Sequence, residues 1–306
     1  MAIGRRGPPC QAEDEMKGMQ FGKILFAVDE SSHMRAAAQS VSRLARATQS
    51  EVVVLHLRPG DNSEPVQAPA PGERIEAIAA LLTDAGVRTT IETRVAPYDA
   101  IAGTIAAVAK QLKADMLALG SRGLSDLSGL FRGSVSHQVI ALSDCPVLVV
   151  RYGVRHPGGP IRRILLAIAG GEDVPHALEA AMTIARATDA EVLVLHARYL
   201  VTGLDSWPYV EPDEYAEQAL VKVVRKLRTA GIRTAVHSPV AAAGVARTIA
   251  HEAHEADVDL VVIGSRRLSD LASLLLGGLD HDVIHLSDRP VLIAERPNPL
   301  VPNATR

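Results

Sequence analysis

The sequence predicts an α/β protein built from two copies of a doubly wound, five-stranded parallel-sheet domain. The chain has 306 residues, which is enough for two domains of ordinary size. Hydrophobic residues make up 47% of it and aromatic residues only 3%, so the core must be built from Val, Leu, Ile and Ala. That composition is typical of buried parallel strands flanked by Ala-rich helices. The second half of the chain also repeats the first.

The repeat is visible without gaps over long stretches. The segment KILFAVDESSHMRAAAQSVSRLARATQSEVVVLHLRP begins at Lys23 and aligns with RILLAIAGGEDVPHALEAAMTIARATDAEVLVLHARY, which begins at Arg163. Further along, LSDCPVLVV at 142–150 matches LSDRPVLIA at 286–294. A repeat of about 140 residues is too long for a solenoid unit, so it indicates a duplicated domain.

Within each half, apolar runs alternate with helical patterns, which predicts right-handed parallel crossovers. We expect first-half strands near 22–28, 51–57, 87–94, 114–120 and 146–151, with helices near 32–48, 72–86, 98–112 and 133–143. We expect second-half strands near 162–168, 191–197, 232–238, 258–264 and 290–295. The expected organisation is a disordered extension at 1–20, domains at 21–152 and 161–297, a Gly- and Pro-rich linker at 153–160 and a tail at 298–306.

A long loop is expected after the second strand of each half. The second-half loop, RYLVTGLDSWPYVEPDE, contains Tyr199, Trp207 and Tyr209, and Tyr215 follows it directly, in a chain that is poor in aromatic residues. We interpret it as a small satellite core, with a lid or a partner surface as the alternative.

Charge and composition exclude several classes of function. The net charge of −3 gives neither a basic footprint for nucleic acid nor a polybasic membrane patch. No apolar stretch approaches the roughly 18–20 residues that span a bilayer, and the first residues lack the apolar core of a secretion signal. The two cysteines, Cys10 and Cys145, predict neither a disulfide nor a zinc site. We therefore expect a cytoplasmic protein with no nucleic-acid or membrane partner.

The most informative motif is GSRGLSDLSGLFRGS, from Gly120 to Ser134, between an expected strand and an expected helix. Its glycines let backbone N–H groups approach anionic oxygens, and a helix N-terminus adds unpaired donors and the positive end of a dipole. The hydroxyls of Ser134 and Ser136 add donors, while Arg122 and Arg132 add positive charge. The motif predicts phosphate binding, although a Gly-rich turn before a helix is by itself a weak signal.

The spacing G-x2-G-x9-G-[ST], met by Gly120, Gly123, Gly133 and Ser134, resembles the ATP-binding signature of the universal stress protein family. ILFAVDESS resembles the first strand of that family with its strand-end Asp, here Asp29. VVLHL and GSVSHQVIALSDCPVLVV resemble its second strand and its last helix and strand. The resemblance covers nearly all of 21–152 and, more loosely, 161–296. It implies strand order 3-2-1-4-5 and last strands that pair the two domains as an intramolecular dimer.

The resemblance also implies a site for ATP and Mg²⁺ in the first half. Ala27, Asp29 and Leu57 would line the adenine pocket, and capping near DESS is a second role open to Asp29. The ribose and phosphates would be held by Gly120, Gly123, Gly133, Ser134, Val135 and Ser136. Leu119, directly before the glycine loop, completes the candidate set.

The second half departs from this pattern at the positions that matter. The second half differs at five matching positions, where it has Ala169, Ala197, Arg267, Gly278 and Asp280 in place of Asp29, Leu57, Gly123, Ser134 and Ser136, in that order. Asp282 adds a second carboxylate to the same helical turn. Like charges roughly 4 Å apart repel by about 4 kcal/mol at an effective dielectric of about 20. These carboxylates would therefore disfavour the binding of a triphosphate at this helix. We expect no ATP binding like that of the first half, although Arg267 could contact a phosphate or Asp280 a metal.

Several histidines also suggest chemistry. His56 and His196 occupy matching strand ends, and we interpret both as packed and hydrogen-bonded rather than catalytic. His137, on the helix after the glycine loop, could contact a nucleotide. His251 and His254, in HEAHEAD, are interpreted as part of a solvated helix face rather than a metal site.

Together these features predict a cytoplasmic stress-response protein that binds ATP with Mg²⁺ and senses it through conformation or assembly. The expected partners are the adenine nucleotide and either a second tandem chain, forming a homodimer, or another protein. The sequence has no Walker A lysine, nucleophile elbow or zinc-hydrolase set, so turnover is expected to be weak at most. The alternatives are a slow ATPase or nucleotide hydrolase, with Asp126 or Asp29 orienting water, and a nucleotide-free scaffold.

Overall fold

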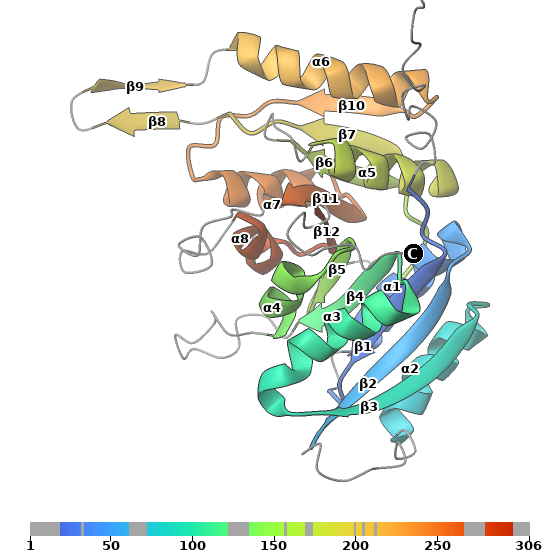
Figure 1. Ribbon diagram of the computed structural model, residues 1–306. Helices are drawn as coiled ribbons and strands as arrows, with labels where there is room; N and C mark the ends of the chain where they lie inside the picture. The colour runs from blue at the N-terminus through green and yellow to red at the C-terminus, as the bar shows by residue number, and fades with distance from the viewer. Residues whose placement is uncertain are drawn as a thin grey trace, which may run out of the picture.

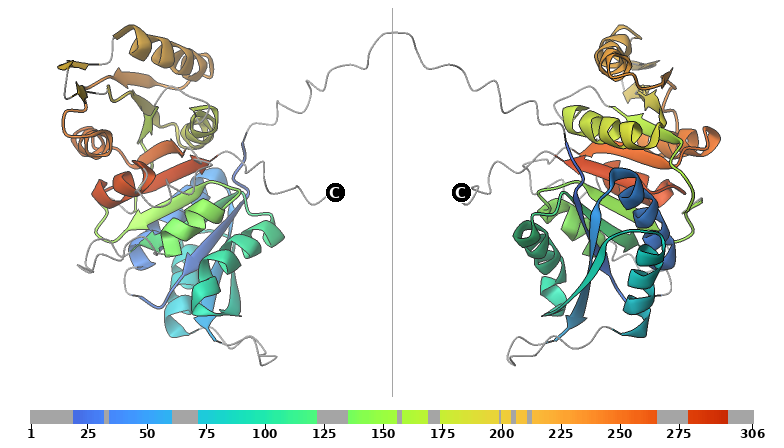
Figure 2. Two further views of the ribbon diagram at one scale, coloured as in Figure 1. Left: turned by 60° about the vertical axis from the view of Figure 1, so that its left-hand side comes forward. Right: turned by 90° about the vertical axis from the view of Figure 1, so that its right-hand side faces the viewer.

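In a computed structural model the chain forms one ten-stranded sheet with helices on both faces (Figures 1 and 2). The structure describes residues 19–31, 34–60, 72–121, 135–155, 158–168, 174–198, 200–203, 206–210, 213–265 and 279–295. The first half of the chain makes one end of the sheet and the second half makes the other (Figure 1).

The first half alternates strands and helices as its apolar runs predict. In chain order its elements are β1 (Lys23–Val28), α1 (Met34–Thr48), β2 (Glu51–Pro59), α2 (Glu73–Asp84), β3 (Thr89–Ala96), a 3₁₀ turn (Tyr98–Ala100), α3 (Ile101–Leu112), β4 (Met116–Ser121), α4 (Val135–Leu142) and β5 (Val147–Arg151). Its strand order is β3-β2-β1-β4-β5, with all neighbours parallel, so the predicted order 3-2-1-4-5 is confirmed.

The second half repeats this arrangement and adds a hairpin. Its elements are β6 (Arg163–Ala167), α5 (Val174–Thr188), β7 (Glu191–Leu195), β8 (Leu200–Gly203), β9 (Ser206–Val210), α6 (Asp213–Thr229), β10 (Thr234–His237), α7 (Val245–Glu255), β11 (Leu260–Ser265), α8 (Leu279–Leu286) and β12 (Val291–Glu295). Its strand order, β10-β7-β6-β11-β12, is again 3-2-1-4-5.

The aromatic loop of the second half is not a plain loop. β8 and β9 pair antiparallel as a separate two-stranded sheet, which extends away from the body of the molecule (Figure 1). The sequence interpretation did not include these strands. The packing of their side chains lies outside what the structure describes, so the satellite-core interpretation stays a prediction.

The two halves use the same hydrogen bonds at the amino edge of the sheet. Asp115 Oδ2 accepts hydrogen bonds from the backbone N–H groups of Gly22 (2.9 Å) and Lys23 (2.8 Å), which lead into β1. The matching Asp259 Oδ2 accepts from Arg162 (2.8 Å) and Arg163 (3.0 Å), which lead into β6. The repeat seen in the sequence is therefore also a repeat of specific contacts.

Helix ends repeat as well. Gln49 and Asp189, which follow α1 and α5, both adopt positive φ values, of 57° and 53°. Lys113 and Asp257, which follow α3 and α7, do the same at 51° and 49°. A left-handed residue after the last turn ends a helix and turns the chain toward the next strand.

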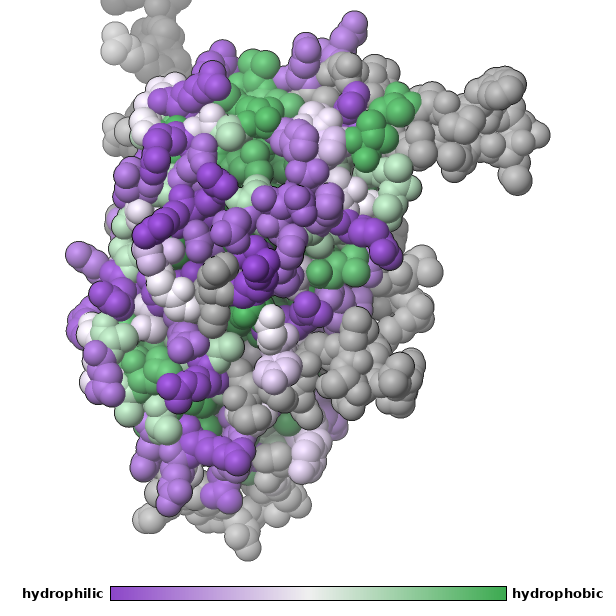
Figure 3. All heavy atoms as spheres, turned by 180° about the vertical axis from the view of Figure 1, so that it is seen from behind, coloured by the Kyte–Doolittle hydropathy of each residue, from purple (hydrophilic) through white to green (hydrophobic). Residues whose placement is uncertain are grey.

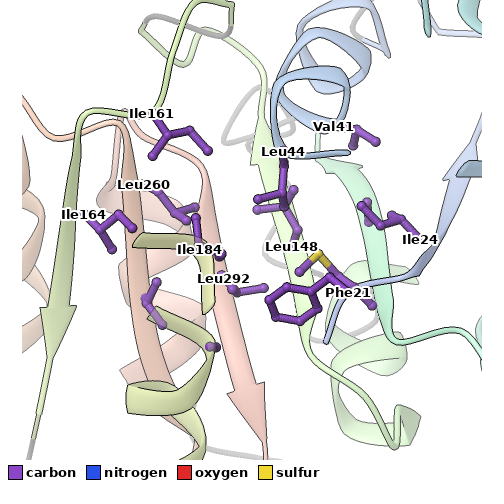
Figure 4. Packing of buried hydrophobic residues seen from close by; sticks show 14 of the residues in the cluster. Phe21, Ile24, Val41, Leu44, Leu148, Ile161, Ile164, Ile184, Leu260 and Leu292 are labelled. Carbon is purple, nitrogen blue, oxygen red and sulfur yellow. The ribbon is translucent and has the colours of Figure 1, made fainter. Parts of the chain in front are cut away.

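Two layers of buried side chains flank the sheet, because successive strand residues face opposite sides. One layer lies under α1, α2, α5 and α6, and the other under α3, α4, α7 and α8. The first layer runs across both halves without interruption: Phe21 and Leu148 of the first half lie beside Leu292 of the second (Figure 4). The face opposite to that of Figure 1 is mostly hydrophilic where the structure describes it, with scattered apolar spots (Figure 3).

β5 and β12 join the halves. They pair antiparallel, with Leu148 opposite Leu292. On one side of this junction the guanidinium of Arg43, on α1, bonds to the backbone oxygen of Asp259 and lies 3.5 Å from its Oδ1. The backbone N–H of Arg155 also donates to the carbonyl of Asp288 at 2.8 Å. Apolar packing, ladder hydrogen bonds and an ion pair therefore all cross the junction.

Candidate functional site

The candidate base-binding residues of the first half lie together at the carboxyl edge of the sheet. Ala27 of β1 pairs with Leu119 of β4 and, on its other side, with Leu55 of β2. Ala27 and Leu119 are buried, Leu57 is partly buried, and all three pack into the layer under α3 and α4. In open α/β sheets this edge is where ligands bind, so the predicted set shares one face and one edge.

Asp29 follows β1 directly and is exposed to solvent. Its Oδ1 accepts a hydrogen bond of 3.0 Å from the backbone N–H of Ser31. This bond closes a turn inside the loop before α1, which begins at Met34. The aspartate therefore holds its loop in place, while the rest of its carboxylate faces water.

Gly120 is the described glycine of the predicted loop, and the end of the Met34 side chain lies against its backbone. A Cβ built on Gly120 would lie 2.9 Å from Met34 Sδ and closer still to its Cε. Met34, in the first turn of α1, is buried against this backbone. A side chain at position 120 would therefore displace the flexible end of Met34, so this contact alone does not require a glycine.

The N-terminus of α4 begins at Val135, whose side chain is 40% exposed, followed by the partly exposed Ser136. The first turn of this helix carries no acidic residue. The positive end of the α4 dipole therefore lies at the carboxyl edge of the sheet, with no carboxylate in the first turn of the helix. The remaining loop candidates lie outside the described residues: Arg122, Gly123, Arg132, Gly133 and Ser134.

The same position in the second half is acidic. α8 starts at Leu279, and Asp280 and Asp282 both lie in its first turn. Ala197, which stands where the first half has Leu57, is buried. The expected placement of the two carboxylates is confirmed, while Ala169, Arg267 and Gly278 lie outside the described residues.

The paired strand-end histidines differ in their bonding. His196 is buried and its Nδ1 lies 3.1 Å from the carbonyl oxygen of Ile168, so the packed, hydrogen-bonded interpretation is confirmed there. His56 is only 4% exposed, but its Nδ1 has no hydrogen-bond partner among the described residues. Burial lowers the pKa of His56, opposed by Glu30, whose Oε1 lies 3.9 Å from its Nε2. His56 is therefore neutral near pH 7.

A cluster of three histidines lies at the junction of the halves. The rings of His137 and His281, which occupy matching positions in the two repeats, are 5.4 Å apart between centroids, and the ring of His285 lies 4.1 Å from that of His281. Arg151 Nη1 donates to the backbone oxygen of His285 at 2.9 Å. Burial lowers the pKa of His281, and the neighbouring His285 and His137 lower it further. Burial and then Arg151 lower the pKa of His285.

Sequence reasoning missed this cluster, although a signal for it exists. Matching residues of two repeats meet only if they lie near the axis that relates the repeats, and His137 and His281 follow their glycine loops at the same distance. Pairing of the last strands brings α4 and α8 to that axis. The cluster could therefore have been predicted once the pairing was assumed.

Two side chains of the HEAHEAD helix contact polar partners outside the helix. His254 Nδ1 lies 2.9 Å from Asp288 Oδ2, and Glu252 Oε2 lies 2.7 Å from His237 Nδ1. His251 is exposed. Across the part of the chain that the structure describes, no group of three or more His, Cys, Asp or Glu side chains has a metal-binding arrangement. The interpretation of this segment as a surface helix face agrees with these contacts.

Fold and site together define a tandem α/β protein whose two halves share a sheet and differ at its carboxyl edge. The universal stress protein family matches the chain twice, at residues 20–151 and 160–295. A universal stress protein of Synechocystis sp. is 35% identical over 161 residues, which is 49% of this chain and 99% of that protein. One of Thermus aquaticus is 33% identical over 136 residues, or 43% of this chain and 99% of the relative.

A solved structure shares the fold over both halves. The crystal structure of a universal stress protein from Archaeoglobus fulgidus covers 92% of this chain with 98% of its own length, at a TM-score of 0.68 and 19% identity. The chain belongs to the universal stress protein family. Among its described helices, none is both long and apolar enough to cross a membrane.

Proposed function

We propose that the N-terminal half binds ATP as its magnesium complex and that the bound nucleotide is sensed as a change of conformation or assembly in a stress response. The contrast between α4 and α8 carries this proposal. The two helices start at matching places, yet the first turn of α4 has no acid and that of α8 has Asp280 and Asp282. The N-terminus of α4 is therefore suited to binding a phosphate, whereas the N-terminus of α8 carries two negative charges that would repel one.

The adenine would lie over the side chains of Ala27, Leu57 and Leu119, which share one face of the sheet edge. Asp29, exposed at the end of β1, lies beside that surface. The phosphates would meet the N-terminus of α4 at Val135 and Ser136. Arg122, Gly123, Arg132, Gly133 and Ser134 would complete the cradle, with Mg²⁺ screening the phosphate charge.

In this proposal the second half is structural or regulatory. It keeps the sheet and contributes β12 to the junction, but it does not take up ATP as the first half does. The tandem chain would work in the cytoplasm, as an internal pair of domains that can associate further into a homodimer or with a protein partner.

Titration calorimetry with Mg·ATP tests the site. We expect about one ATP per chain. Ser136→Asp copies Asp280 into the first half and sets a carboxylate against the phosphates; at about 4 kcal/mol of repulsion the affinity should fall about a thousandfold. Ala141→Asp is the matched control, because Ala141 is an exposed residue at the other end of the same helix. It adds the same charge and should change the affinity little.

Other outcomes would point to the alternatives. Two equal sites per chain would contradict the assignment of the second half as degenerate, and no binding at all would leave a nucleotide-free scaffold. Gly123→Arg, which copies Arg267, should also abolish binding. Release of phosphate at many turnovers per chain, lost in Asp126→Asn, would favour the hydrolase.

A further inference from the structure

A basic groove lies between α5 and α6 in the second half, away from the proposed nucleotide site. It is open to solvent and has a volume of about 540 Å³. Met182 and Ala230 form apolar parts of its lining. Its cationic residues are Arg186, Lys222, Arg225 and Lys226. We call it the α5–α6 groove.

Most of the positive charge in the α5–α6 groove is not neutralised by its neighbours. Lys226 forms an ion pair with Glu179. Arg186, Lys222 and Arg225 have no acidic side chain within ion-pair distance in the described part of the chain. Several like charges around one groove repel each other, so the groove favours an anionic occupant.

The chain itself supplies acidic residues close by. The described part of the chain starts at Met19, whose side chain packs against the core and whose carbonyl accepts a 2.9 Å hydrogen bond from Thr183 Oγ1 on α5. Glu13, Asp14 and Glu15 stand four to six residues before Met19 in the sequence. Because Thr183 follows Met182 directly, the acidic segment is anchored to a helix that forms one wall of the groove.

The chain between Met19 and the acidic residues is long enough to reach the α5–α6 groove. An extended chain covers about 3.3–3.6 Å per residue, so Glu15 can lie about 14 Å from Met19 and Glu13 about 20 Å. A helix with its side chains is about 10–12 Å across. The segment can therefore cross α5 from Thr183 and enter the groove on its far side. A short tether of this kind also gives an effective concentration in the millimolar range.

We propose that residues 13–15 occupy the α5–α6 groove of their own chain, where three carboxylates meet the three unpaired cations. The segment then acts as a built-in competitor for any polyanion that approaches this face. Exposed ion pairs are individually weak and screened by salt, so the contact is reversible and strongest at low ionic strength.

Carbodiimide coupling of the full chain tests the contact, because it joins a carboxylate to a lysine amine only when the two touch. In low salt, we expect cross-links from Glu13, Asp14 or Glu15 to Lys222 or Lys226, which Lys222→Arg with Lys226→Arg should remove. Lys23, Lys110 and Lys113, all in the first half, are internal controls. A mixture of isotopically light and heavy protein separates links within a chain from links between chains. Links mainly to the control lysines, links between chains, or none would overturn the proposal.

Binding of heparin, used as the polyanion probe, gives an independent measure. The variant Glu13→Gln/Asp14→Asn/Glu15→Gln should bind heparin about tenfold more tightly than the natural chain, and adding Lys222→Gln/Arg225→Gln should remove the gain. Glu73→Gln/Glu76→Gln/Asp84→Asn, on exposed positions of α2, removes the same charge at the other end of the sheet and serves as the control. Equal affinities for all of these proteins, or an equal gain in the control, would contradict the proposal.

Discussion

Leu148 and Leu292 provide a direct test of the junction between the halves. They lie opposite each other in the β5–β12 ladder, and both are almost fully buried in the layer that crosses the junction. Truncation of a buried Leu to Ala costs about 2–5 kcal/mol in unfolding free energy. We expect about 3 kcal/mol for Leu148→Ala and for Leu292→Ala. The double variant should lose about 1 kcal/mol less than the sum, because the second truncation enlarges a cavity that already exists.

The matched control pair is Leu82 on α2 and Leu227 on α6, which are equally buried. These helices cover opposite ends of the ten-stranded sheet, about 40 Å apart at 4.8 Å per strand. Their truncations should therefore add within about 0.5 kcal/mol. Urea unfolding followed by far-ultraviolet circular dichroism measures the unfolding free energy of the natural chain, the four single variants and the two double variants. Additivity at the junction pair, or two separate unfolding transitions of which Leu148→Ala shifts only one, would refute a shared core.

Two further predictions concern charge at the junction. Because the pKa values of His281 and His285 are lowered in the folded chain, the unfolded chain binds more protons below about pH 6.5, so stability should fall from pH 7.5 to pH 5.5. His281→Gln/His285→Gln should flatten the dependence of the urea midpoint on pH, and an unchanged slope would contradict the argument. The side chain of Arg289 is 0% exposed and pairs with Asp257 Oδ1 at 2.9 Å and Asp288 Oδ1 at 3.1 Å. Arg289→Ala should lower the unfolding free energy by about 3 kcal/mol, and the volume-conserving Arg289→Met should lower it clearly less. Thermal or urea unfolding measures both. Equal losses would mean that the ion pairs, and not the packing of the side chain, account for its contribution to stability.

The fold could be predicted from the sequence because the patterns that indicate it lie within short stretches of the chain. Apolar runs separated by helical patterns predict a parallel sheet, and the internal repeat predicts two of them. The β8–β9 hairpin was missed, although Trp207 and Tyr209 alternate as strand residues do, because Pro208 between them argues against a strand. Pairing of β5 with β12 was expected only through the family resemblance, since an edge strand carries no mark of its partner.

The candidate site was harder to predict from the sequence than the fold, because more than one physical requirement acts on its residues. Gly120 reads as part of a phosphate loop, but its contact with Met34 joins positions that nothing in the sequence links. His56 and His196 occupy matching positions after the shared residues Val and Leu, yet only His196 has its Nδ1 near a backbone oxygen in the described part of the chain. Contacts between distant segments decide these cases, and one sequence does not reveal them.

A comparison of the two halves separates the residues that the fold requires from those that the proposed function requires. At the amino edge of the sheet they agree in detail: Asp115 and Asp259 accept the same pair of backbone hydrogen bonds. At the carboxyl edge they diverge, and Asp280 stands in the place of Ser136. A parallel sheet needs its amino-edge contacts whether or not a ligand binds, whereas the carboxyl edge is free to change once a half no longer holds a ligand. A carboxylate in place of the Ser136 hydroxyl at that edge is therefore what the proposed function predicts for a half that no longer holds a ligand.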